Sequence, residues 1–219
     1  DLHSTSRRQR QMCIRDRLKN RYRIGGSDAA AILGMNPYKD NVTLWREKTG
    51  QATAEDISEK YYVKYGTEAE RPLRELFALD FPQYDVGYVE NNMFLNARYP
   101  FGHASLDGWL TDQKGRKGVL EIKTTNIMQS AQKDKWKQRV PDNYYIQLLH
   151  NLLITEFEFA VLKAQLKFDY GGGVLLHTKH YFVERSEVEE DIRYLAAAEE
   201  EFWKSVQDKR EPALILPEI

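Results

Sequence analysis

The chain has 219 residues, of which 42% are hydrophobic and 30% charged, with a formal net charge of −1 at pH 7, and this fits one soluble globular domain. No apolar run reaches the roughly 18 residues of a membrane span and no signal peptide opens the chain, so we expect a cytoplasmic protein without membrane contact. The single cysteine, Cys13, excludes a disulfide framework, a cysteine zinc site and an iron–sulfur cluster.

Residues 1–17 differ in character from the rest of the chain. They lack apolar periodicity and read as a translated sequencing-library adapter, so we expect this segment to be non-native or disordered and 18–219 to form one domain. The alternative is a basic arm that grips DNA. The segment holds five arginines and two aspartates, so the remaining chain carries 27 basic and 31 acidic residues, a net charge of −4. Any DNA-binding surface must therefore be local.

Helices are predicted early in the chain over 27–33, 42–48 and 67–79. Ser27 or Asp28 is a suitable N-cap for the first helix. The third places Glu70 on the same face as two apolar residues, three and seven positions further on. Pro72 is expected in the first turn of this helix, where its missing N–H is tolerated.

The second half of the chain alternates between strand and helix patterns. Short strands are predicted over 86–90, 94–97, 104–110 and 117–124. A helix is then expected over 144–154, followed by strands over 157–168 and 175–184 and a last helix over 186–209. This order predicts an α/β (α+β) fold with a central mixed sheet flanked by helices.

The strongest chemical pattern is Asp107 followed by Glu121 and Lys123. Glu121 and Lys123 share one face of their predicted strand, and a short turn brings the strand back to Asp107. The two carboxylates and the Ile122 carbonyl could hold a hard cation, which activates water, while the lysine deprotonates that water or stabilises developing charge. The alternatives are an Asp-Gly turn and a solvated ion pair.

Two further polar residues stand on otherwise apolar helix faces. Glu70 needs a partner there, and this is either a metal shared with the two carboxylates or Arg74, one helical turn away. The amide of Gln147 must also be hydrogen-bonded. It could orient the attacking water or Lys123, or it could join helix to sheet.

Several stretches together carry a family resemblance. They are Arg23 to Gly34 followed by Asn-Pro-Tyr at 36–38, Gly66 to Glu70, Leu106 to Gly108, Leu120 to Lys123, and Val140 to Gln147. In this order they resemble the YqaJ-type viral recombinases, relatives of phage lambda exonuclease within the PD-(D/E)xK nuclease superfamily. The resemblance spans about residues 21–210.

The resemblance implies a restriction-endonuclease-like core and a set of site residues. It implies that Mg²⁺, or Mn²⁺ in its place, is held by Asp107, Glu121, Ile122 and Glu70. It assigns catalysis to Asp107, Glu121, Lys123 and Gln147. It places Arg23 and Ser27 near the DNA end, although a surface arginine and a helix cap are the alternatives. Leu149 stands where many relatives carry a second glutamine, and the following His150 is expected to be structural.

The activity that the resemblance implies is a Mg²⁺-dependent exonuclease that digests duplex DNA ends from 5′ to 3′. It further implies a single-strand annealing protein as partner and a homo-oligomer such as a trimeric ring. One rival is a structure-specific or restriction-type endonuclease on the same core. Another is a non-catalytic DNA-binding relic, against which the retention of Asp107, Glu121 and Lys123 argues.

Overall fold

A computed structural model describes residues 20, 22–169 and 171–216, and the segment 1–17 singled out above lies outside these residues. The helices are α3 (Gly26–Ile32), α4 (Asn41–Lys48), α5 (Tyr61–Asp80), α6 (Ser130–Asp134), α7 (Asp142–Thr155) and α8 (Glu189–Gln207). The strands are β1 (Asp85–Gly87), β2 (Gly108–Thr111), β3 (Lys117–Ile127), β4 (Phe159–Asp169) and β5 (Val174–Glu184). A 3₁₀ turn, Arg185–Glu187, precedes α8.

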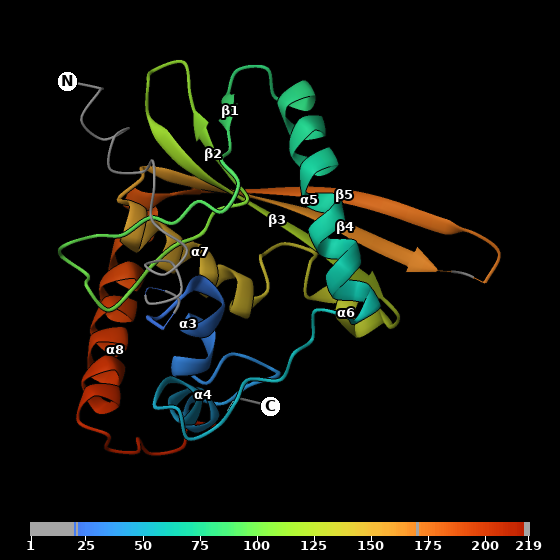
Figure 1. Ribbon diagram of the computed structural model, residues 1–219. Coiled ribbons are helices and arrows are strands. Elements are labelled where there is room, and N and C mark those ends of the chain that lie inside the picture. The colour runs from blue at the N-terminus through green and yellow to red at the C-terminus, as the bar shows by residue number, and fades with distance from the viewer. Residues whose placement is uncertain (1–19, 21, 170, 217–219) are drawn as a thin grey trace.

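The strands form one mixed sheet in the order β1-β2-β3-β4-β5 (Figure 1). The central pair, β3 and β4, is parallel, and all the other neighbours are antiparallel. Two parallel strands need a crossover connection, and the chain between β3 and β4 supplies it with α6 and α7. The predicted mixed sheet flanked by helices is confirmed.

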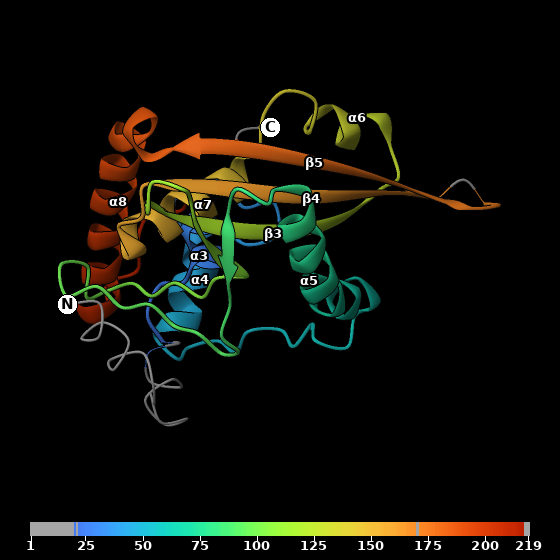
Figure 2. The ribbon, with the colours of Figure 1, turned by 90° about the horizontal axis from the view of Figure 1, so that it is seen from above.

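Helices cover both faces of the sheet, as the view from above shows (Figure 2). On one face, α7 packs between the sheet and the helices α3 and α8, and Val119 of β3 belongs to this core. On the other face, α5 packs Leu73 and Phe77 against Leu120 and Ile122 of β3. Because successive side chains of a strand point to opposite faces, Glu121 is directed toward α7.

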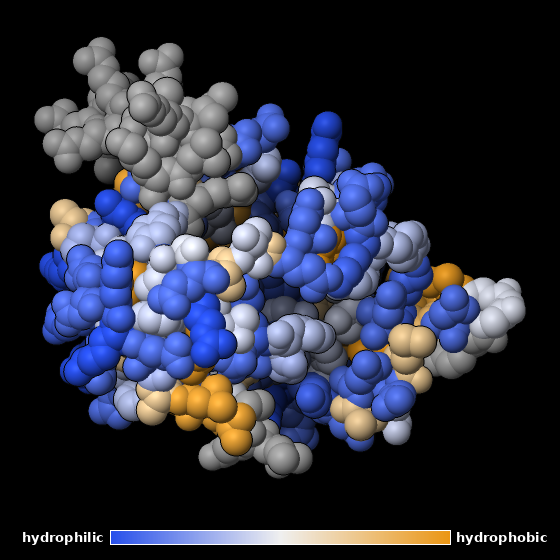
Figure 3. Space-filling view, turned by 60° about the horizontal axis from the view of Figure 1, so that its bottom comes forward, coloured by the Kyte–Doolittle hydropathy of each residue, from blue (hydrophilic) through white to orange (hydrophobic). Residues whose placement is uncertain are grey.

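The β4–β5 hairpin extends beyond the helical layers, toward the right of Figure 1. Hydrophilic residues cover most of the face in Figure 3, and a small hydrophobic area lies near this end of the molecule. About half of the surface of Val174, Leu175 and Leu176 is exposed there. No helix in the described part of the chain is long and apolar enough to cross a membrane.

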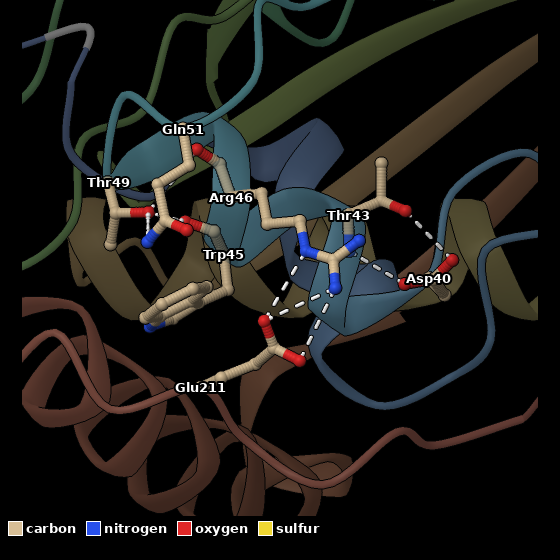
Figure 4. A network of polar contacts seen from close by, with 7 residues as sticks. All are labelled: Asp40, Thr43, Trp45, Arg46, Thr49, Gln51 and Glu211. Carbon is tan, nitrogen blue, oxygen red and sulfur yellow. Dashed lines mark hydrogen bonds and ion pairs between the residues drawn. The ribbon is translucent and has the colours of Figure 1, made fainter.

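The C-terminal segment is tied to α4 by polar contacts (Figure 4). Asp40 caps α4 by accepting a hydrogen bond from the backbone of Thr43, as expected at an N-cap. Arg46 pairs with Glu211 at 3.3 Å, and the Trp45 indole N–H donates to the carbonyl of Ser205. These contacts fix α4 beside α8.

Two predicted strands are wrong or too long. Residues 94–97 are not a strand and touch the next segment through one bridge, Phe94 to Ala104, while β2 begins only at Gly108. The reason is that the Asn92 side chain forms the hydrogen bonds that the Leu106 backbone would otherwise make with a neighbouring strand. The Asn92 side chain accepts from the Leu106 N–H and donates to the Leu106 carbonyl, both at 2.8 Å. A side chain thus replaces a neighbouring strand.

The helix predicted over 67–79 begins six residues earlier, so Pro72 lies in the interior of α5 and not in its first turn. Proline cannot donate to the carbonyl of Glu68, four residues before it. Glu68 is exposed, so water can satisfy that carbonyl. The apolar contacts of Leu73 and Phe77 with the sheet keep the helix continuous.

Candidate active site

The site begins where β3 continues beyond its neighbour β2. The two strands pair only from Lys117 to Leu120 of β3, so the edge of β3 from Glu121 onward has no β2 partner. Asp107, directly before β2, takes this place, and its Oδ2 accepts the Ile122 N–H at 2.7 Å. The N–H and C=O of a strand residue point to the same edge. The Ile122 carbonyl is therefore directed to the edge at which Asp107 lies.

Glu121 is a buried carboxylate with only 1% of its surface exposed. Its Oε1 lies 2.6 Å from Lys123 Nζ and accepts the Gln147 amide at 2.6 Å. Its Oε2 accepts the Asn151 amide at 3.0 Å. A buried charge is costly unless it is paired and hydrogen-bonded, and these contacts meet both conditions. They also fix the orientation of the carboxylate.

Helix α7 brings both amides to Glu121 because Gln147 and Asn151 stand one helical turn apart on one face. A close approach of α3 supports this arrangement. A Cβ on Gly26 would lie 3.0 Å from both Asn151 Oδ1 and Gln147 Cγ. Glycine at position 26 therefore lets α3 pack directly on the two amide side chains.

Asn151 and Arg74 belong to the site, and sequence reasoning did not assign either to it. Asn151 could have been found as a second polar residue one turn after Gln147 on an apolar helix. Arg74 donates from Nη1 to the Asp107 carbonyl at 2.5 Å and lies 3.6 Å from the ring centre of Tyr88. Arg74 makes these two contacts, and among the described residues it forms no ion pair with Glu70 within 4.0 Å.

The acidic side chains are close enough to influence one another. Burial and the charge of Asp107 raise the pKa of half-buried Glu70 to about 7. Burial also raises the pKa of Asp107 and of Glu121. Burial alone would lower the pKa of Lys123, but the charges of Glu121 and Asp107 outweigh it, and the pKa of this lysine is raised. The site therefore combines mutually repelling carboxylates with one protonated amine.

The donors of this site suit a hard divalent cation, because Mg²⁺ takes oxygen ligands. Asp107, Glu121 and Glu70 offer carboxylates whose mutual repulsion such a cation would relieve. Within the ranges that the structure describes, no three acidic, histidine or cysteine side chains converge into a ready metal cage. Among the described residues, Lys123 and Gln147 contact Oε1 of Glu121, whereas Asn151 alone contacts Oε2, so Oε2 keeps a lone pair that the ion could use.

The two residues predicted to contact DNA lie in different depressions. Ser27 is exposed and lines a cleft of about 500 Å³ together with Gln147 and Asn151, so this cleft adjoins the buried Glu121. Arg23 instead lines a groove between α8 and residues 97–101. Ser27 does not cap α3 either. Gly25 is the N-cap residue of α3, and its N–H donates to the Asp28 side chain.

His150 lies on α7 behind the site and is fully buried. Its Nδ1 lies 2.7 Å from Glu199 of α8, and its Nε2 lies 2.9 Å from the carbonyl of His103. These contacts join α7 to α8 and to the segment before β2. Both ring nitrogens of His150 are thus directed to Glu199 and to the His103 backbone rather than to Glu121 or Lys123, as expected of a structural residue.

A comparison with protein families gives a match over residues 8–158 to the YqaJ-like viral recombinase domain. The chain belongs to this family. It is 31% identical over 202 residues to an uncharacterized protein YqaJ of Bacillus subtilis (strain 168). That match covers 90% of the chain and 57% of the relative, so the chain spans little more than half of that protein's length.

Solved structures of exonucleases share the fold. An alkaline exonuclease (LHK-Exo) from Laribacter hongkongensis aligns with a TM-score of 0.63 and 16% identity, over 88% of this chain and 94% of that chain. A phage-related exonuclease from Haemophilus somnus 129PT aligns with a TM-score of 0.56 and 13% identity, over 88% and 99%. At these identities the likeness establishes the architecture that the YqaJ-like domain adopts.

Proposed function

We propose that this YqaJ-like domain is a Mg²⁺-dependent exonuclease that hydrolyses phosphodiester bonds at duplex DNA ends, from 5′ to 3′, in phage-type recombination. The observation that carries the proposal is the ion pair of buried Glu121 with partly exposed Lys123, beside Asp107 on the open edge of β3. The exonucleases that share the fold support the same activity. The acidic and basic groups at this edge are those that metal-assisted hydrolysis requires.

Asp107, Glu121, Glu70 and the Ile122 carbonyl are the residues that would hold Mg²⁺, with Mn²⁺ as a substitute. When bound, the ion would supply Lewis-acid polarisation of the phosphate and a water of lowered pKa. The Ile122 N–H keeps Asp107 turned toward the β3 edge. Arg74 holds the backbone of Asp107 through its carbonyl.

Lys123 is proposed to act as an electrostatic stabiliser. In the ion-free site the charges of Glu121 and Asp107 raise the pKa of Lys123, so the side chain is an ammonium there. From β3 its Nζ would neutralise charge that develops on a phosphoryl oxygen. Gln147 and Asn151 hold the Glu121 carboxylate in place while the lysine acts.

The cleft beside Glu121 is proposed to receive the end of the DNA. Ser27 and the backbone of the α3 start line this cleft, which reaches Gln147 and Asn151. Arg23 lies in a different groove, so its proposed DNA contact would be separate from that of Ser27. A single-strand annealing protein and a trimeric ring of this chain remain part of the proposal as partner and assembly.

The test measures degradation of linear and closed circular duplex DNA in Mg²⁺ by the wild type and by Lys123→Ala. Lys117→Ala is the matched control, because it changes an exposed lysine of the same strand. We expect the wild type and the control to degrade linear DNA only. Lys123→Ala should be inactive, and EDTA should abolish all degradation.

Other outcomes would redirect or refute the proposal. Cleavage of closed circles would indicate an endonuclease, since an exonuclease needs an end. No degradation of either DNA by the folded wild type would refute the catalytic assignment. End-labelled linear DNA separates the polarities, because 5′-to-3′ digestion releases a 5′ label first.

A further inference from the structure

The segment between β3 and α7, residues 128–140, has a charge opposite to that of the whole chain. We refer to it as the basic segment. It contains Lys133, Lys135, Lys137 and Arg139 but only one acid, Asp134, which gives it a charge of +3 in a chain of net charge −1. A local basic surface of this kind is what a nucleic-acid-binding protein of acidic or neutral composition needs.

Buried aromatic contacts hold the basic segment on the sheet. Trp136 is buried, whereas residues 128–135 and 137–139 on either side of it are exposed. Its carbonyl accepts hydrogen bonds from the Tyr181 hydroxyl and the Lys179 ammonium of β5. The lysines at 133, 135 and 137 and Arg139 are all exposed. The segment is therefore anchored at its centre while its cations face solvent.

The anchor lies one side chain away from Lys123 of the candidate active site. The Trp136 ring packs on Tyr144 with 5.5 Å between ring centres. Lys123 Nζ lies 5.3 Å from the same Tyr144 ring. The segment also connects β3 to α7, the elements that carry Lys123 and Gln147, and Figure 1 shows α6 at the end of β3.

The charges of the basic segment are only weakly compensated. Lys137 pairs with Asp134 at 2.7 Å and Arg139 with Asp142 at 3.6 Å, and all four side chains are more than half exposed. Exposed pairs of this kind contribute little free energy. Lys135 forms no ion pair with any described residue. The cations can therefore exchange their present contacts for phosphates.

We infer that the basic segment binds the phosphate backbone of duplex DNA and guides the duplex to the site at Glu121 and Lys123. This inference rests on the proposed function and adds to it the surface that holds the substrate. Phosphate contacts supply most of the sequence-independent affinity for DNA and make it dependent on salt.

The test compares two fourfold variants that change the net charge equally. The first replaces Lys133, Lys135, Lys137 and Arg139 by glutamine. The control replaces by glutamine four exposed cations that line neither depression, Lys114, Lys117, Lys209 and Arg210. Binding of a fluorescent duplex is measured by anisotropy over a series of NaCl concentrations. EDTA and a Lys123→Ala background prevent cleavage, so the binding result does not depend on whether the wild type is a nuclease.

We expect the first variant to bind about tenfold more weakly or worse, and the slope of log affinity against log salt to become shallower by about 3 to 4. The control should stay close to the parent protein in both quantities. An equal loss in both variants would assign the effect to overall charge and overturn the inference. So would an unchanged slope in the first variant, or a parent protein whose duplex binding does not depend on salt.

Discussion

Glu121 shows at the scale of single residues how this fold holds a charge in its interior. A carboxylate with 1% exposure would be expensive to bury alone, and Lys123 and the amides of Gln147 and Asn151 compensate that cost. Each donor therefore sets the position of the carboxylate as well as its charge. Replacing one donor should therefore weaken metal binding more than it lowers the stability of the fold.

Asn151→Leu tests this at the contact with Glu121 Oε2. The substitution removes one hydrogen bond and keeps the branched shape and the number of heavy atoms of the side chain. Removing such an outer contact lowers metal affinity or activity by about 10- to 100-fold. We expect the Mg²⁺ concentration for half-maximal nuclease activity to rise accordingly, with a smaller change in Tm.

Asn143→Leu, on the same helix, is the control and should leave the Mg²⁺ dependence unchanged. An Asn151→Leu enzyme with normal Mg²⁺ dependence and a lowered Tm would show that the amide has only a structural role.

Arg74 offers a second test at the residue scale. Its guanidinium lies over Tyr88 and donates to the Asp107 carbonyl. Arg74→Met should lower the free energy of unfolding by about 1 to 3 kcal/mol because it leaves the carbonyl without its donor. Arg74→Lys should not restore the lost stability, since an ammonium cannot stack on the Tyr88 ring and donate in the same plane.

The measurement is urea unfolding of each variant together with its Mg²⁺-dependent activity. Arg71→Met is the control, because Arg71 stands on the same helix with 81% of its side chain exposed. Equal losses of stability in the variants at 71 and 74 would contradict a specific role for Arg74.

Part of the site was predictable from residue spacing, and part was not. The two-residue spacing of Glu121 and Lys123 placed them on one strand face, and the structure pairs them at 2.6 Å. The separation of Arg23 from Ser27 was not predictable. They stand four residues apart, but the Ile24 N–H bonds to the Phe101 carbonyl between them and divides the surface into two depressions. Such a division depends on a contact distant in sequence.

At the scale of elements, the packing of α7 on α8 depends on a buried polar pair. His150 and Glu199 are fully buried and lie 2.7 Å apart. Burial alone would lower the pKa of His150, but the Glu199 carboxylate outweighs it, so the pKa of His150 is raised. The pair therefore stabilises the fold when the histidine is charged.

The sign of the pH dependence follows from this raised pKa. The contribution is complete below the pKa of an unfolded histidine, about 6.5, and is lost as the pH rises through the higher folded pKa. Glu199→Gln removes the counter-charge, and breaking a buried pair in this way costs about 3 to 5 kcal/mol. We expect the free energy of unfolding of the wild type to exceed that of the variant by about this amount below pH 6.5 and by less at higher pH.

Urea unfolding of both proteins across this pH range measures the difference, in which the titration of all other groups cancels. A difference that stays constant with pH would mean that His150 is neutral in the folded protein. Ser205→Ala, a buried polar change on the same helix, should give a difference without pH dependence.

Element boundaries were predictable where burial follows the sequence period and not where side chains replace backbone partners. The apolar positions of α7 and β4 lie where their patterns indicated. The strand predicted over 104–110 is shortened because Asn92 binds the backbone of Leu106. An asparagine in a loop carries no sequence signal for such a partner fourteen residues away.

At the scale of the whole molecule, repulsion among the carboxylates gathered at the site opposes folding. Glu70, Asp107 and Glu121 come from α5, the segment before β2 and β3, so folding brings together carboxylates that the unfolded chain keeps apart. A divalent cation that binds only the folded chain would compensate this repulsion and stabilise the protein.

Addition of Mg²⁺ should therefore raise the Tm. At a concentration of about 100 times its Kd, a ligand adds about 2.7 kcal/mol, which for a chain of this size corresponds to about 5 °C or more. Asp107→Asn is the informative variant, because asparagine can still accept the Ile122 N–H but brings no charge. Its Tm without Mg²⁺ should equal or exceed that of the wild type, since one repelling charge is gone, and Mg²⁺ should then raise it far less. Calorimetry in Mg²⁺, in EDTA and in NaCl of equal ionic strength separates ion binding from screening, and an equal rise for the wild type and Asp107→Asn would place the bound ion elsewhere on the molecule.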